Sequence, residues 1–218
     1  MKKKVSPTQK ALNLWAVILI VWSVYRVNLR MPEWFDELVA KPLVFIVPVY
    51  YYLKTVDKKN FFPALFLKPR MILKDFLFGL MIGAVFIASA LLANYFRFKK
   101  LIFLSQPPAL NYVLWVSLLA LATGISEEIL SRGFILKKLY EDSHNIYTAS
   151  FFASILFFFL HVPILFTNIH ITGNLLLIFM LTDMILSLVL SFIFLTRQSL
   201  TLPIIIHALY NIVLTLFV

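Results

Sequence analysis

The sequence predicts an all-α protein that crosses a membrane several times, and three features of its 218 residues indicate this fold. First, 61% of the residues are hydrophobic and only 14% are charged, whereas a soluble domain needs more polar residues to cover its surface. Second, the apolar residues form long continuous runs instead of the short alternating segments of a membrane β-barrel. Third, most of the 20 Lys and Arg residues lie between these runs. We therefore expect a polytopic transmembrane helix bundle with about seven (six to eight) membrane helices.

Seven apolar runs are each long enough, or nearly so, to cross a hydrocarbon core of about 30 Å. The second run contains Pro42 and Pro48, which predict a kink or a late start. The first follows Met1 and three lysines, as in a signal peptide, but it has no small-residue cleavage site, so we expect a retained helix. The polar, basic segment Lys54–Asp75 is the expected linker and could hold an interfacial helix. The runs are Ala11–Val27, Leu38–Leu53, Ile72–Tyr95, Leu110–Tyr140, Ile146–Phe166, Leu175–Leu195 and Leu200–Val218.

The basic residues predict a cytoplasmic N-terminus. With that orientation, 14 of the 20 Lys and Arg residues fall on the inner side and 6 on the outer side, as the positive-inside rule requires. The net charge of +10 is thereby explained by topology and anionic head groups, and we expect no nucleic-acid partner. We divide the chain into N-terminal transmembrane helices with a cytoplasmic linker, residues 1–109, and a functional core, residues 110–218. The six outer charges are Arg26, Arg30, Lys41, Arg97, Lys99 and Lys100.

Glu127, Glu128 and Arg132 lie deep inside the fourth apolar run, where charges are costly and indicate function by default. Glu127 and Glu128 are adjacent, so on a helix their carboxylates point about 100° apart and serve different faces. Glu128 and Arg132 are i and i+4 with the acid first, the favourable order for an ion pair. Glu127 is then free to act on another face. The alternative is that both acids only neutralise Arg132 and hold helices together.

Polar residues in the last three runs can reach the same depth as Glu127. His207 and Asn211 are i and i+4 in the seventh run and share a face, and His161 lies in the fifth. At the rise of an α-helix, Glu127 and His207 lie about 15 Å from basic residues at the inner side, and His161 lies about 22 Å from the inner start of its run. One buried site near mid-bilayer is therefore possible. Asp183 in the sixth run is expected either to pair with a neighbouring helix or to face this site.

Three short motifs in apolar helices, in this order, resemble the signature of the CPBP family. This family comprises CAAX proteases, bacteriocin-processing enzymes and Abi-like proteins, which are intramembrane glutamic endopeptidases. The resemblance covers about Val113–Leu214. It departs from the family pattern where Ser187 and Ser191 replace glycines that often precede the last motif, although serine also permits close helix packing. The motifs are Glu127-Glu128-x-x-x-Arg132, Phe157-x-x-x-His161 and His207-x-x-x-Asn211.

The resemblance implies hydrolysis of a peptide bond without a metal or a covalent intermediate, in a C-terminal four-helix core, residues 110–218. Glu127 and His161 would activate a water that attacks the scissile carbonyl. His207 and Asn211 would stabilise the developing oxyanion. The i,i+4 ion pair described above would orient the site.

Two other functions are compatible with the same residues. A zinc peptidase could use Glu127, His161 and His207 as ligands, although a helical H-E-x-x-H motif is absent from the sequence. A non-enzymatic scaffold, immunity or transport protein could use the site for binding or proton relay. The expected partners are the lipid bilayer and a peptide or membrane-protein substrate, with no cofactor, and the oligomeric state is not specified. The short loops and compact size favour a prokaryotic cell membrane.

Overall fold

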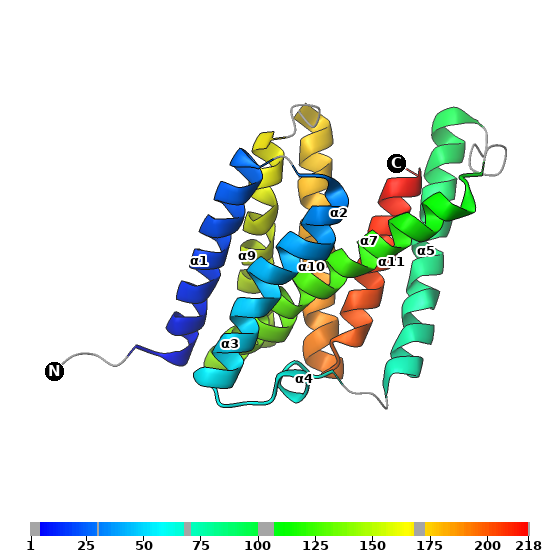
Figure 1. Ribbon diagram of the computed structural model, residues 1–218. Coiled ribbons are helices and arrows are strands. Elements are labelled where there is room, and N and C mark those ends of the chain that lie inside the picture. Colours follow the sequence, from blue (N-terminus) through cyan, green and yellow to red (C-terminus); the bar gives the residue numbers. More distant parts are fainter. Residues whose placement is uncertain (1–4, 30, 68–70, 100–106, 168–172, 218) are drawn as a thin grey trace.

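The computed structural model describes residues 5–29, 31–67, 71–99, 107–167 and 173–217, and all regular structure within these segments is helical (Figure 1). Six helices are long and apolar enough to cross a membrane, and a shorter apolar helix follows them. The predicted all-α, polytopic bundle is therefore confirmed. The elements are α1 Pro7–Asn28, α2 Glu33–Phe35, η1 Asp36–Ala40, η2 Pro42–Ile46, α3 Val47–Thr55, α4 Phe61–Ala64, α5 Ile72–Phe98, α7 Leu110–Glu128, η4 Ile129–Leu136, α8 Lys137–Ser143, α9 Ile146–Thr167, α10 Gly173–Arg197 and α11 Thr201–Phe217.

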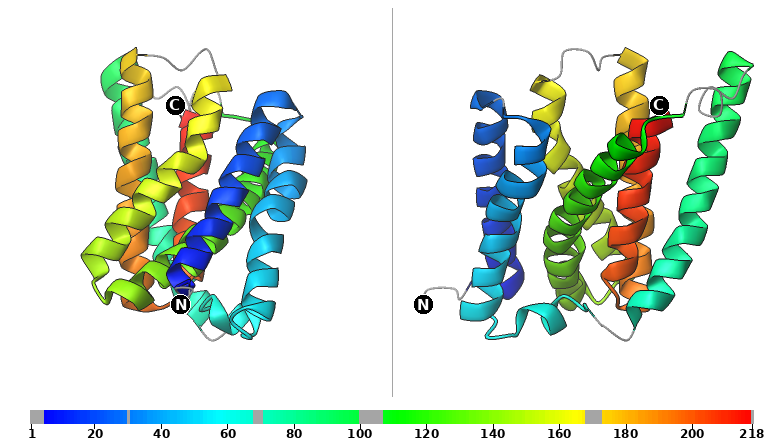
Figure 2. Two further views of the ribbon diagram at one scale, coloured as in Figure 1. Left: turned by 90° about the vertical axis from the view of Figure 1, so that its left-hand side faces the viewer. Right: turned by 45° about the vertical axis from the view of Figure 1, so that its right-hand side comes forward.

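The long helices stand side by side, and α7 crosses them obliquely (Figures 1 and 2). Helix α11 packs most extensively against α5 on one side and α7 on the other, while α10 packs against α9. Helix α1 lies against α9 and α8. Helix α1 begins at the end of the bundle where α3 ends and α4 lies, and α11 ends at the opposite end (Figures 1 and 2).

The second membrane helix is continuous from Glu33 to Thr55 in spite of its two prolines. Its hydrogen bonds widen to the π register, in which the Lys41 N–H bonds to Asp36 O and the Val47 N–H to Pro42 O. Proline lacks an N–H and its ring clashes with the carbonyl four residues earlier, and a wider turn relieves that conflict. The predicted late start is therefore wrong, because the helix begins before the apolar run does.

The basic linker between the second and third runs folds against the same end of the bundle as α8. It contains α4, a single helical turn, and the interfacial position considered for a helix in this linker stays a prediction. Lys137 Nζ donates to Ala64 O at 2.6 Å, and Lys138 Nζ lies 2.7 Å from Asp57 Oδ2. Further along, Arg197 Nη2 pairs with the fully buried Asp75 at 2.8 Å.

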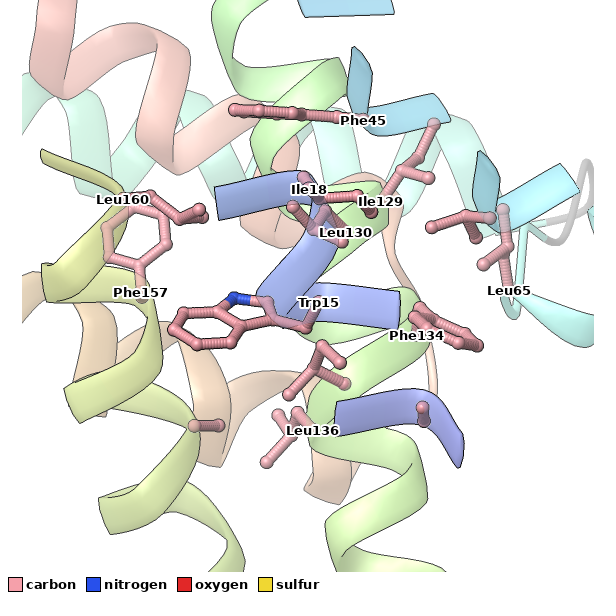
Figure 3. Packing of buried hydrophobic residues seen from close by; sticks show 14 of the residues in the cluster. Trp15, Ile18, Phe45, Leu65, Ile129, Leu130, Phe134, Leu136, Phe157 and Leu160 are labelled. Carbon is pink, nitrogen blue, oxygen red and sulfur yellow. The ribbon is translucent and has the colours of Figure 1, made fainter. Parts of the chain in front are cut away.

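One apolar core joins the N-terminal helices to the last part of the chain. Ile18 of α1 and Phe45 of η2 belong to the same buried cluster as Leu130 of η4 and Phe157 of α9 (Figure 3). Inside a membrane such clusters are held by van der Waals packing, since lipid tails are as apolar as the side chains. This core fixes the second membrane helix against η4, where the predicted site residues lie.

Candidate active site

The paired glutamates lie where the fourth membrane helix changes its register. Glu127 and Glu128 end α7, and the eight residues of η4 follow with π-type hydrogen bonds. Such π segments are rare and often occur at functional sites. Both residues are buried, with 4% and 0% of their surface exposed. Their carboxylates pair with different cations, as their adjacent positions predict, although both approach His207.

Glu128 forms the predicted ion pair with Arg132. Arg132 Nη1 donates to Glu128 Oε1 at 2.8 Å, and Nη2 donates to Ser187 Oγ at 2.8 Å and to the Ser187 carbonyl at 3.1 Å. The guanidinium also lies 4.3 Å from the ring centroid of Phe157. Ser187, expected only to permit close packing, therefore accepts hydrogen bonds from a buried cation and ties α10 to η4.

His207 connects α11 to the same carboxylate. Its Nδ1 lies 2.8 Å from Glu128 Oε1, and the residue is 2% exposed. Because the carboxylate only accepts, Nδ1 carries the hydrogen of this bond. The other ring nitrogen, Nε2, faces Glu127 Oε2 at 3.8 Å.

His161 faces Glu127 from α9. Its Nε2 lies 3.5 Å from Glu127 Oε2, while its Nδ1 lies 3.2 Å from Phe157 O and 3.4 Å from Asp183 Oδ2. Both neighbours of Nδ1 are acceptors, so the geometry favours a hydrogen on Nδ1 and leaves Nε2 directed at Glu127. Of the two positions expected for Asp183, the structure thus shows the one that faces the site.

Lys41 also reaches this site, and the sequence did not indicate it. We counted it among the outer topology charges, but it is 4% exposed and its Nζ lies 2.7 Å from Glu127 Oε1. The same ammonium lies 2.6 Å from Glu37 Oε2, one turn earlier. Thr123 of α7 donates to Glu37 Oε2 at 2.5 Å. The only signal in the sequence was the i,i+4 spacing of an acid and a base at the start of an apolar run.

Asn211 lies at the edge of this cluster, on the wall of a cavity of about 480 Å³. Glu37 and Thr123 line the same cavity, which lies among α2, η1, α7 and α11. Within the described part of the chain, no hydrogen bond joins the Asn211 side chain to Glu127 or His207. The structure therefore brings five of the six predicted site residues into one connected cluster and puts Asn211 beside it. The five are Glu127, Glu128, Arg132, His161 and His207.

A close approach of α7 and α11 brings the first and third motifs together. A Cβ atom on Gly124 would lie 3.0 Å from the Ile204 carbonyl oxygen and 3.5 Å from the Ala208 backbone nitrogen. Because position 124 has no side chain, α11 can lie directly against α7. That contact brings His207, the neighbour of Ala208, within hydrogen-bonding distance of Glu128.

The cluster is suited to acid–base chemistry in a dry environment. Glu127 Oε2 faces two imidazole nitrogens and has no hydrogen-bond partner among the described residues. Its other oxygen already pairs with an ammonium. Across the described ranges, no three or more His, Cys, Asp or Glu side chains are arranged to hold a metal ion. Carboxylates and imidazoles at these separations can take up and release protons.

Comparison with known proteins gives one match. The family model described as type II CAAX prenyl endopeptidase Rce1-like matches residues 109–213. These residues contain all three motifs on which the resemblance to the CPBP family was based. No curated protein and no solved structure matches the chain.

Proposed function

Through residues 109–213 the chain belongs to the CAAX protease family, and on this premise we propose that it hydrolyses a peptide bond with a water activated by Glu127 and His161. The family supports the general activity of an intramembrane CAAX-type protease in an integral membrane protein. The glutamic mechanism, which the resemblance to the CPBP family implies, is part of this proposal. The observation that carries it is the buried pair of Glu127 Oε2 and His161 Nε2, which face each other at 3.5 Å.

Two hydrogen-bond acceptors that face each other can both be satisfied by one water molecule, which donates a hydrogen to each. With a hydrogen on Nδ1, neutral His161 has a lone pair on Nε2, and Glu127 Oε2 is also an acceptor. A water bound by both would direct its own lone pair at a carbonyl carbon. In the proposed step the new C–O bond forms as a proton passes from the water to this pair. The C–N bond then breaks, and that proton goes to the leaving amine.

The oxyanion would be stabilised from α11. Since His207 donates through Nδ1 to Glu128, it can also donate through Nε2 only as the doubly protonated imidazolium, whose charge the Glu128 carboxylate supports. Asn211 can donate in its neutral form from the cavity wall. A carbonyl in this cavity would meet Asn211 at the wall, and the proposed step requires it to reach the Nε2 atom of His207 as well. Each such donor contributes about 10²–10³ in turnover.

A cleavage assay in detergent tests this mechanism. Wild type and Glu127→Gln are compared on a peptide library, with Glu141→Gln as the matched control, because Glu141 is exposed at the end of α8. We expect Glu127→Gln to fold normally and to lose hydrolysis, while the control keeps it. Wild-type turnover in Glu127→Gln would refute the role of Glu127. Loss of activity in a chelator, restored by zinc, would support a zinc peptidase, and a protein that binds peptides but cleaves none would support a non-enzymatic role.

We also propose that the protein lies in a prokaryotic cell membrane with its N-terminus in the cytoplasm. The 14 to 6 distribution of basic residues supports this orientation. The chain has no Cys, so single cysteines report topology without a background signal. A membrane-impermeant thiol reagent should label Asn111→Cys in intact cells and should not label Lys58→Cys. The opposite pattern would reverse the orientation.

A further inference from the structure

Lys41 is a buried cation whose position the family resemblance does not explain, since it lies outside the matched residues 109–213. A lysine in a membrane helix normally extends its ammonium toward the head groups. Here the side chain is 5% exposed and points into the bundle. Trp22 of α1 lies beside it, with the ring centroid 6.0 Å from Nζ. The bundle therefore holds this ammonium inside, at the cost of its hydration.

The two partners of Lys41 show what this position does. Glu127 Oε1 and Glu37 Oε2 lie 2.7 and 2.6 Å from Nζ. A carboxylate that pairs with an ammonium through one oxygen cannot exchange its two oxygens freely. Glu127 therefore keeps Oε2 toward His161 and His207, at 3.5 and 3.8 Å. Lys41 also compensates a buried negative charge, which otherwise would be very unfavourable.

We infer that Lys41 is a positioning residue of the active centre, which fixes the carboxylate of Glu127 so that one oxygen faces both histidines. The second membrane helix thus supplies part of the site, together with the helices of the matched region. This inference rests on the proposed function for its kinetic consequence, but the ionic contact itself can be tested without any activity.

Glu37 extends this arrangement to the cavity. It holds Lys41 from one turn away, accepts a hydrogen bond from Thr123 of α7, and lines the cavity that also contains Asn211. A substrate in that cavity would meet Glu37 and would not meet Lys41 directly. For this reason, loss of the Lys41 ammonium should change the chemical step more than substrate binding.

Kinetics of Lys41→Met test the positioning role, with Lys54→Met as the matched control. Lys54 lies in the same helix, and its Nζ contacts only the ring and hydroxyl of Tyr50 among the described residues. We expect kcat of Lys41→Met to fall by about 10²-fold, the effect of a small misplacement at a reacting centre, with KM changed by less than about threefold. Lys41→Arg should restore part of kcat because it keeps the cation. A Lys41→Met enzyme with the kcat of Lys54→Met would overturn the inference.

Thermal unfolding separates this inference from the proposed function. If Lys41 pairs with Glu127, Lys41→Met should lower the melting temperature. The double variant Lys41→Met/Glu127→Gln should recover part of that loss, because the buried Glu127 carboxylate is then no longer left without its cation, while Glu37 keeps its hydrogen bond from Thr123. This also holds if wild type cleaves no peptide, in which case the proposed function fails and the ionic contact stands. Should Lys41→Met alone fail to fold, recovery of a folded double variant would support the contact. The contact would be overturned if the double variant lost as much melting temperature as the two single variants together, or if it were no more stable than Lys41→Met.

Discussion

The buried pair of Glu128 and Arg132 predicts a stability effect much larger than that of an ordinary ion pair. We consider Glu128→Leu and Arg132→Met, which replace each charged side chain with an apolar side chain of similar size. Glu128 is 0% exposed and Arg132 is 1% exposed, so neither charge can be hydrated when its partner is removed. Removal of one partner from a buried pair destabilises by about 3–5 kcal/mol.

Each of the two substitutions also changes contacts outside the ion pair. Glu128→Leu also removes the acceptor for His207 Nδ1, a net loss of about 1 kcal/mol for a hydrogen bond. Arg132→Met removes two bonds to Ser187 but keeps apolar contact with Phe157. The double variant leaves no unpaired charge, so its loss should be smaller than the sum of the single losses by about 0.5–3 kcal/mol.

Reversible unfolding in mixed detergent micelles measures these differences. The control is Lys59→Ala, because Lys59 and Glu141 form an exposed pair at 3.9 Å, and such pairs contribute about 0–1 kcal/mol. If Glu128→Leu and Arg132→Met unfold like the control, or if the double variant loses the full sum, the pair is hydrated or uncoupled and the structural role given to it is wrong.

Three further predictions concern the mechanism and the helix contact that supports it. Asn211→Ala should lower turnover by about 10²–10³ without moving the pH optimum, because it removes a neutral donor and no titrating group; a shifted optimum in a pH–rate profile would remove Asn211 from the oxyanion site. His161→Ala should lower turnover further and change the shape of that profile, since it removes a group that takes up the proton, and an unchanged shape would contradict this role. Gly124→Val should lower both melting temperature and activity, because its side chain would meet the Ile204 carbonyl; Ala122→Val is the control on the same helix, and equal effects of the two would show that the close contact of α7 with α11 is dispensable.

The sequence predicted the membrane helices well because their signal is local. Each apolar run corresponds to a helix of the structure, and even the boundary between α7, η4 and α8 lies within the single predicted run Leu110–Tyr140. The prediction of a late start or a kink from the prolines of the second run gave them too much weight. A helix that widens to the π register accommodates Pro42 and Pro48 without a break, and no local propensity distinguishes that outcome from a kink. The division of the chain at residue 110 stays a prediction.

The polar cluster was predictable only in part, because a sequence pattern reports contacts within a helix and not contacts between helices. The contact of Glu128 with Arg132 is intrahelical and follows from spacing alone, as does the shared face of His207 and Asn211. Contacts between helices depend on rotation and depth, which a run of apolar residues does not specify. Asn211 shares the face of His207 but lies one turn further along α11, where the cavity begins.

Lys41 shows why the missing part of such a site is difficult to find in a sequence. It is separated from Glu127 by 86 residues, and by composition alone a single lysine near the end of an apolar run looks like a topology signal. What distinguishes it is a balance of charge: a buried carboxylate directed at two imidazoles requires a cation, and Arg132 is already engaged by Glu128. For two adjacent glutamates in a membrane helix with one nearby arginine, the structure supplies a second cation from another helix. Lys41 lies one turn after Glu37 within an apolar helix, and it meets that requirement.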